Sequence, residues 1–302
     1  MDKHAYLIIA HNQFELLYRL LELIDDNRND IFIHIDKKTK DVDFKKIASH
    51  VKKASLFFTE RTSVWWGGYS QINAELLLLK KATETATYSY YHLVSGIDLP
   101  IKTQDYIHEF FAQQNGKEFV GYDDTEIKNF SIKKRVRFYH PFQDITGRTK
   151  SIYYYLEELI IAIQKIFHTN RQKGNNTLFQ KGCNWFSITD KLARYTVSKE
   201  EEIKKTYKFT KCCDEIFLQT LVWNSEFKNN IYAIPTSASD DTGSADTMRY
   251  IDWKRGTPYT FKDGDLDEIM ASDMLFARKF NIDTHPKIIY DIYDKIKQLQ
   301  TF

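Results

Sequence analysis

The chain has 302 residues, enough for one large α/β domain or two smaller ones, so a sizeable core is expected. Hydrophobic residues make up 42% and charged residues 28%, a balance that excludes disordered, collagen-like and coiled-coil chains. The 43 Lys and Arg against 41 Asp and Glu leave a formal net charge of +2, too balanced for a dedicated nucleic-acid binder, so no nucleic-acid partner is expected.

Apolar runs alternate with amphipathic segments in the first third of the chain, which predicts parallel βαβ units. Asn12 is expected to cap a helix that ends near Ile24, and Ser70 a long helix that ends at about residue 87. Ligands of such sheets bind beyond the carboxyl ends of the strands, so residues that follow a strand are candidates for a site. Continuous apolar runs typical of buried strands occupy residues 6–10, 31–35, 54–58 and 89–94.

The second half of the chain is less regular. Its patterns predict strands at residues 118–122 and 184–188, and helices at 151–167 and 214–223. No internal repeat, low-complexity tract or long linker divides the sequence. We therefore predict one α/β domain over residues 1–302, with a Rossmann-like, mostly parallel central sheet flanked by helices.

The cysteines and the hydropathy favour the cytoplasm. Cys183, Cys212 and Cys213 cannot all pair within the chain, and adjacent cysteines rarely bridge, which favours a reducing compartment. The apolar run near the N-terminus is too short for a signal sequence, and no segment reaches the ~20 apolar residues of a membrane span. We expect a cytoplasmic protein without a transmembrane segment, for which peripheral contact with a membrane stays open.

Several cofactor and metal motifs are missing from the sequence. It has no glycine-rich dinucleotide or phosphate loop, no zinc-protease helix and no Cys/His set with zinc spacing, so those enzyme classes lack their anchors. A metal-dependent nucleotide-sugar enzyme needs two carboxylates at the end of a strand. The strand at residues 31–35 ends at Asp36, but Lys37 and Lys38 follow and supply no second carboxylate. We expect neither a metal nor another cofactor.

An ordered series of short motifs covers nearly the whole chain. The motifs are IAHN at 9–12, HID at 34–36, SVWWGGYS at 63–70, LVSGIDLPIK at 93–102, DE at 214–215 and LFARKF at 275–280. Each is weak alone, but the series in this order resembles the core-2/I-branching β-1,6-N-acetylglucosaminyltransferases and the related peptide xylosyltransferases (glycosyltransferase family 14). The resemblance implies a GT-A-like fold, inversion at the anomeric carbon, and a UDP-sugar donor handled without a divalent metal.

Glu215 is the predicted catalytic base. Inverting sugar transfer requires a base that takes the proton of the acceptor hydroxyl, and positive charge that stabilises the departing nucleoside diphosphate. The Asp-Glu pair precedes an apolar segment, and the position of Glu215 resembles that of the family's catalytic glutamate. The alternative is an acidic residue favoured by a helix N-terminus, which fits Asp214 equally well.

Lys279 and Arg255 are the predicted ligands of the donor diphosphate. Lys279 resembles the basic residue that the family uses there, and the family's arginine partner lies further upstream, where Lys254 and Arg255 form the nearest basic pair. We favour Arg255 because a planar guanidinium can bind phosphate oxygens with two hydrogen bonds. The alternative for Arg278 and Lys279 is a solvated end of a helix.

Four further residues are assigned to the donor site by the resemblance. His11, Asp36 and Trp66 resemble the edge of the site that faces the uridine, and Asp98 is a candidate neighbour of the donor sugar. Two structural alternatives remain open: Trp66 could be a core residue packed on the following glycines, and Asp98 could cap a turn before Pro100.

Arg135 and Trp253 are the acceptor-side candidates. Arg135 lies in the basic segment 133–135, which resembles the family's acceptor segment, and the ring of Trp253 could stack on a sugar face. The alternatives are a solubilising surface patch for Arg135 and a core position for Trp253.

The leading hypothesis is an inverting, metal-independent glycosyltransferase that acts on a glycan or glycoprotein hydroxyl. UDP-N-acetylglucosamine is the first choice of donor, ahead of UDP-xylose, UDP-galactose and UDP-glucuronate. We expect a donor-binding half at about 1–125 and an acceptor and catalytic half at about 126–302. Vertebrate members of the family carry a membrane anchor and many disulfide cysteines, so a bacterial type is expected here. The alternative is a non-catalytic nucleotide- or carbohydrate-binding module on a degenerate transferase scaffold, against which Glu215 and Lys279 together argue.

Overall fold

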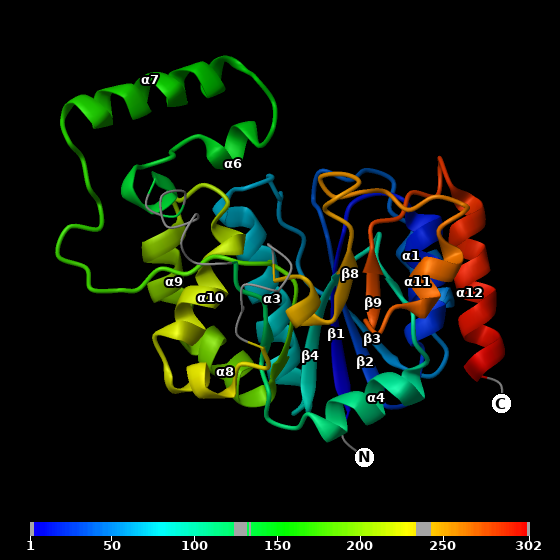
Figure 1. The fold of residues 1–302 in the computed structure, drawn as a ribbon. Helices are drawn as coiled ribbons and strands as arrows, with labels where there is room; N and C mark the ends of the chain where they lie inside the picture. The colour runs from blue at the N-terminus through cyan, green and yellow to red at the C-terminus, as the bar shows by residue number, and fades with distance from the viewer. Residues whose placement is uncertain (1–2, 124–131, 133, 234–242, 301–302) are drawn as a thin grey trace.

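The computed structural model describes residues 3–123, 132, 134–233 and 243–300, and a six-stranded mixed sheet lies at the centre of this part of the chain (Figure 1). The strand order is β3-β2-β1-β4-β7-β6; the first four strands are parallel, and β7 runs antiparallel to both β4 and β6. The strands are β1 His4–Ala10, β2 Asn29–Ile35, β3 Ser55–Phe58, β4 Tyr90–Ser95, β6 Phe119–Val120 and β7 Phe186–Thr189.

A second sheet, of three strands, packs beside the first, and one of its strands ends directly before Lys279. Its order is β5-β9-β8, with β5 at Leu99–Pro100, β8 at Arg249–Ile251 and β9 at Phe276–Arg278. The Phe280 N–H donates to Ile97 O (3.1 Å), so the residue after Lys279 is fixed against the turn that follows β4.

Helices cover both faces of the central sheet, as Figure 1 shows. One face packs against α1 (Phe14–Ile24) and α12 (Pro286–Gln300), the other against α3 (Tyr69–Thr85), α8 (Asp190–Ser198) and α10 (Phe217–Trp223). The remaining described helices are α2 Phe44–Ser49, α4 Gln104–Gln113, α6 Gln143–Thr146, α7 Ile152–Ile166, α9 Glu200–Tyr207 and α11 Leu266–Ala271, with 3₁₀ turns η1 Cys213–Glu215, η2 Glu226–Asn230 and η3 Ala245–Thr247.

Burial on both faces explains the continuous apolar runs of the parallel strands. In β1, Tyr6 and Ile8 belong to the core under α1 and α12, whereas Ala5 and Leu7 belong to the core under α3 and α10. Successive side chains of a strand point to opposite faces, so a strand between two helical layers must be apolar at every position. The predicted α/β class, with a mostly parallel sheet flanked by helices, is confirmed.

Three predicted helix starts are wrong. The cap of α1 is Gln13, in a left-handed conformation, rather than Asn12. The cap of α3 is Gly68 in extended backbone, so Ser70 lies inside the helix. The expected helix at 214–223 begins at Phe217, because residues 213–215 form the separate turn η1. Glu215 is therefore held by a short 3₁₀ turn and does not lie in the first turn of a long helix.

Candidate active site

The carboxyl ends of β1, β2 and β4 meet where the strand order reverses, which is the usual ligand edge of such a sheet. The Asp36 N–H donates to Ala10 O (3.0 Å), and the Gly96 N–H donates to Ile9 O (2.9 Å). These bonds bring the residues that follow three strands to one edge, and His11 and Asp36 are neighbours there. Burial lowers the pKa of His11, an effect that the charge of Asp36 opposes, so the ring is neutral near pH 7.

Asp36 is buried in the turn that follows β2. Its Oδ1 accepts from the Lys38 N–H (2.9 Å), and the Lys38 ammonium lies 3.4 Å from Oδ2. Lys38 Nζ also lies 3.9 Å from the ring centroid of Trp65. Arg61 fixes the other side of the turn by donating to the carbonyl oxygen of Asp36 (2.8 Å). The Asp36 turn is thereby joined to the Trp65-Trp66 segment.

Trp66 is not a core residue. Its side chain is 43% exposed, and the guanidinium of Arg148 lies 4.2 Å from the ring centroid. Gln143, at the start of α6, donates from its amide to Trp66 O (2.8 Å). The structure therefore presents Trp66 at the surface with a cation on its face.

Gly68 and Ser70 fasten α3 to α6. Both the N–H and the hydroxyl of Ser70 donate to Asp144 Oδ1, at 3.0 and 2.6 Å. A Cβ at Gly68 would lie 2.0 Å from that same oxygen, so only glycine permits this approach without a shift. Ser70 thus acts as an anchor for α6, where the sequence predicted a helix cap.

The same segment also holds the turn that carries Glu215. Gly67, whose φ of 70° suits glycine, accepts at its carbonyl oxygen from the Cys212 N–H (2.7 Å). Gln71 donates from its amide to Asp214 Oδ2 (3.0 Å). The 63–71 segment therefore connects the Asp36 turn to the candidate base.

Glu215 lies between two cations. Its Oε2 is 2.7 Å from Arg135 Nη1 and 3.5 Å from Lys181 Nζ, and Lys181 also lies 2.6 Å from Asp123. Burial acts to lower the pKa values of Arg135 and Lys181, but the charges of Glu215 and the other acidic neighbours outweigh it and raise both. The Glu215 side chain remains 33% exposed, so its carboxylate is oriented and still accessible.

Two buried carboxyl groups lie behind Glu215. Burial raises the pKa of Asp214 to about 7, and the charge of Glu215 is the second cause of this rise. Burial also raises the pKa of Glu75, on α3, well above its usual range, with Asp214 adding to the effect. Among the described residues, neither Asp214 Oδ1 nor Glu75 Oε2 has a hydrogen-bond partner, so no donor to these oxygens offsets the burial that disfavours their charged forms.

Lys279 lies in a local excess of positive charge. Burial lowers its pKa, and Arg278 and Arg148 lower it further. Arg278 is 3.4 Å from Asp98 and lies over the ring of Trp185, 4.0 Å from the centroid. Within the described part of the chain, Lys279 has no ion pair of its own, so an anion placed beside it would be favoured.

Asp98 does cap the turn after β4. It accepts from the N–H of Ser95 (2.8 Å) and from the Ser95 hydroxyl (2.7 Å), and it is almost fully buried. Since Arg278 pairs with the same carboxylate, Asp98 also fixes the residue that precedes Lys279.

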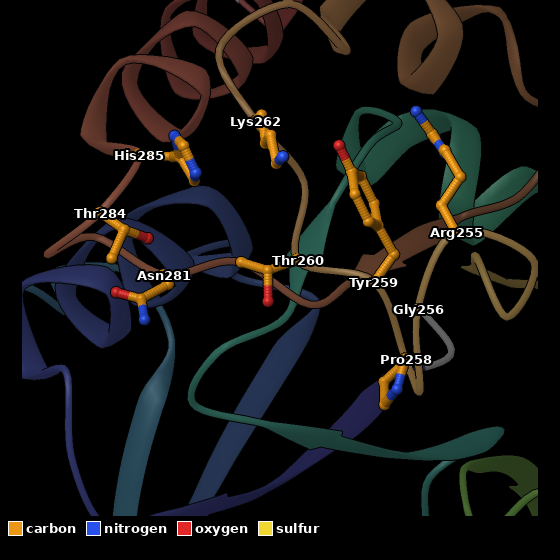
Figure 2. A pocket seen from close by; sticks show the side chains of 9 residues that line it. All are labelled: Arg255, Gly256, Pro258, Tyr259, Thr260, Lys262, Asn281, Thr284 and His285. Atoms are coloured by element: carbon orange, nitrogen blue, oxygen red, sulfur yellow. The ribbon is translucent and has the colours of Figure 1, made fainter.

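Arg255 is surrounded by carboxylates. Its guanidinium pairs with Asp252, Asp265 and Glu268, and it stacks 4.3 Å from the ring centroid of Tyr259. Arg255 and Tyr259 line an open cavity of about 490 Å³, and Figure 2 shows their side chains pointing the same way. Among the predicted site residues, Arg255 alone lines this cavity, whose other lining residues are Gly256, Pro258, Tyr259, Thr260, Lys262, Asn281, Thr284 and His285.

The two acceptor-side candidates have different partners. Arg135 is at Glu215, as described above, whereas Lys133 of the same basic segment lies outside the described residues. Trp253 is 41% exposed, and its ring N–H donates to Ser244 Oγ (3.1 Å). It is therefore a surface residue and not part of the core.

Sequence analysis missed four residues that build the site. Lys181 and Asp123 lie outside any motif, and only the fold brings them to Glu215. Arg148 has no sequence signal that links it to Trp66. Gln71 directly follows the SVWWGGYS motif, so extending that motif by one residue would have included it.

Metal-binding clusters and membrane-spanning helices were sought in the described ranges. No group of three or more His, Cys, Asp or Glu side chains there could hold a metal ion. No helix in those ranges is both long enough and apolar enough to cross a membrane.

Sequence comparison identifies the class of protein. The profile "Branch: Core-2/I-Branching enzyme" matches residues 4–275, so the chain belongs to the core-2/I-branching enzyme family, as the motif series predicted. Rat xylosyltransferase 2 is 23% identical over 94% of this chain and 32% of its own length. Mouse N-acetyllactosaminide β-1,6-N-acetylglucosaminyl-transferase is 23% identical over 93% of this chain and 69% of its own.

The chain thus spans about a third of the xylosyltransferase and about two thirds of the N-acetylglucosaminyltransferase. Among solved structures, apo mouse xyloside xylosyltransferase 1 aligns with 93% of this chain and 99% of its own, at 9% identity and a TM-score of 0.37.

Proposed function

We propose that the protein is an inverting glycosyltransferase that moves a sugar, with N-acetylglucosamine as first choice, from a UDP-sugar to a hydroxyl group of a glycan or glycoconjugate. Family membership supports sugar transfer. The observation that supports the mechanism is the environment of Lys279. Within the described chain its ammonium has no ion pair, and it lies among other cations beyond the strand ends. Such a position favours a diphosphate.

Glu215 is the base of the proposed reaction. Its carboxylate takes the proton of the acceptor hydroxyl while that oxygen forms a bond to C1 of the donor sugar. The bond from C1 to the diphosphate oxygen breaks on the opposite face, and its electron pair leaves with UDP. Arg135 and Lys181 hold the carboxylate in one orientation, which a base needs before it accepts a proton.

Lys279 and Arg148 are the proposed cations for the leaving diphosphate, in place of a metal. Both the burial of Lys279 and the charge of Arg148 disfavour an uncompensated ammonium there, and a bound diphosphate would relieve both effects. The sequence predicted Arg255 as the second cation. Because three carboxylates already balance the charge of Arg255, we assign the role to Arg148 and test the two side by side.

The other assignments complete the proposal. His11, Asp36 and Trp66 form the uridine side, Asp98 positions Arg278 near the sugar, and the acceptor lies toward Arg135 and Trp253. In this proposal the donor-binding half at about 1–125 supplies the uridine side, and the acceptor and catalytic half at about 126–302 supplies Glu215 and also the two diphosphate cations.

A cytoplasmic location is part of the proposal. It is supported by Cys183, Cys212 and Cys213, which are all buried free thiols.

A thermal-shift screen tests the donor and the absence of a metal. UDP-N-acetylglucosamine, UDP-xylose, UDP-galactose and UDP-glucuronate are each added with EDTA or with Mn²⁺, because a ligand bound only by the folded state raises its melting temperature. We expect a shift with one UDP-sugar that EDTA leaves intact, and transfer under the same conditions. Activity that EDTA abolishes and Mn²⁺ restores would refute metal independence. UDP binding without donor hydrolysis or transfer would favour the binding-module alternative.

Three matched variants test the diphosphate cations. Lys279→Ala and Arg148→Ala should each weaken UDP binding about tenfold or more and leave uridine binding nearly unchanged, whereas Arg255→Ala should change neither. If Arg255→Ala weakens UDP binding and Arg148→Ala does not, the second cation is Arg255. Equal effects of Lys279→Ala on UDP and uridine would place Lys279 away from the phosphates.

A further inference from the structure

The outward face of α7 is apolar. This helix lies at the outer edge of the molecule, at the end opposite the N-terminus, as Figure 1 shows. Its large apolar side chains are exposed instead of packed, and Ile166 and Phe167 are 73% and 77% exposed. The exposed apolar residues of this surface, which we call the α7 face, are Ile152, Tyr153, Tyr155, Leu156, Leu159, Ile163, Ile166 and Phe167.

The inward face of α7 is polar by comparison. Gln164 is buried and exchanges two hydrogen bonds with the backbone of Tyr139, at 2.8 and 2.9 Å. Glu157 is also buried and accepts from the Phe142 N–H (3.0 Å). An amphipathic helix of a soluble domain normally turns its apolar stripe toward the core. Here Gln164 and Glu157, together with the single buried apolar residue Ile161, attach the helix to the protein, and the wider apolar stripe is left for a partner.

The charges around α7 indicate what that partner is. Residues 148–173 contain five Lys or Arg and two Glu, and one of these, Glu157, is buried against His140. Exposed lysines lie at both ends of the helix, with Lys150 before it, Lys165 in its last turn and Lys173 in the loop that follows. If two copies paired through their α7 faces, either orientation would bring lysine ends together. An anionic surface instead complements both ends at once.

We propose that α7 docks the protein on an anionic lipid membrane, with the α7 face buried at the boundary between headgroups and acyl chains and its lysines on the headgroups. Basic flanks around an apolar, aromatic-containing face are the usual features of such interfacial helices. The chain then lies on the membrane without crossing it. β1 runs from the N-terminus toward the α7 end, so the candidate site at the carboxyl ends of the strands lies on the membrane side of the sheet.

Vesicle co-sedimentation of the full chain tests the proposal. Wild type is mixed with vesicles of phosphatidylcholine alone or with added phosphatidylglycerol, at low and high salt. We expect binding to the anionic vesicles at least about tenfold tighter than to the neutral ones, and weakening with salt. The double variant Leu159→Glu with Ile163→Glu should lose this binding about tenfold or more. Leu299→Glu, which adds a charge at an exposed leucine of α12, should bind as wild type does.

Multi-angle light scattering separates the membrane from a second copy of the chain. Wild type should be monomeric without vesicles, and the double variant should melt at the same temperature because both replaced side chains are exposed. Absence of binding to anionic vesicles overturns the proposal, as does equal binding to neutral ones. A wild-type dimer that the double variant converts to a monomer would instead assign the α7 face to self-association.

Discussion

Replacing Asp214 by Asn tests the electrostatics behind the candidate base. Burial and Glu215 raise the pKa of Asp214 from 3.8 to about 7, so the folded state holds a proton that the unfolded chain has already lost above pH 4. The stabilisation from this group is therefore complete below pH 4 and is lost as the pH rises toward 7. A shift of about 3 units corresponds to about 4 kcal/mol at 1.36 kcal/mol per unit.

Asn cannot ionise, but its side-chain oxygen can still accept from the Gln71 amide. Asp214→Asn should therefore be more stable than wild type by up to about 4 kcal/mol at pH 8 and nearly equal to it at pH 4. Urea unfolding at the two pH values measures this difference. Asp273→Asn makes the same change at an exposed position and serves as the control. A variant that differs from wild type by the same free energy at both pH values would refute a protonated Asp214.

Two further predictions concern stability. Gly68→Ala should lower the free energy of unfolding by about 1–3 kcal/mol, because the new Cβ would lie 2.0 Å from Asp144 Oδ1. Thermal denaturation measures this loss. An unchanged melting temperature would contradict the packing of α3 on α6. Burial lowers the pKa of His108 to about 4, and the charge of Arg28 is the second cause. The neutral His108 ring therefore stabilises the folded state above pH 6.5, and this stabilisation is lost as the pH falls toward 4. His108→Asn should therefore reduce the acid sensitivity of unfolding by up to about 1.4 kcal/mol per pH unit in this range, and an unchanged pH slope would argue against a neutral ring.

The parallel part of the sheet could be predicted from the sequence because its strands are buried on both faces. The runs at residues 6–10 and 31–35 lie inside β1 and β2, and α7 differs from its predicted range by one residue at each end. Residues 118–122 were predicted as a strand, but β6 contains only two of them. These two residues pair at the edge of the sheet, and the apolar residues beside them belong to no strand. The start of α1 was missed because Gln13 adopts a left-handed conformation that a non-glycine side chain rarely signals.

The candidate site could be predicted only for residues that belong to recognisable sequence motifs. His11, Asp36 and Trp66 each follow or approach a strand end, and position in a parallel sheet is enough to place them at one edge. The neighbours of Glu215 could not be predicted, because Lys181 and Asp123 lie far from it in sequence and approach it only through the fold. Arg255 shows what residue type alone leaves out: a guanidinium suits a diphosphate, but the carboxylate partners Asp265 and Glu268 are visible only in three dimensions.

The rate of sugar transfer by Glu215→Gln, measured in EDTA with the donor found in the thermal-shift screen, tests the central claim most directly. We predict a loss of about 10²–10⁴-fold with unchanged affinity for UDP, because the amide keeps the size of the side chain and cannot accept the acceptor proton. Glu226→Gln, at an exposed glutamate of η2, should keep full activity. A Glu215→Gln protein that transfers sugar at the wild-type rate would show that another group removes the proton.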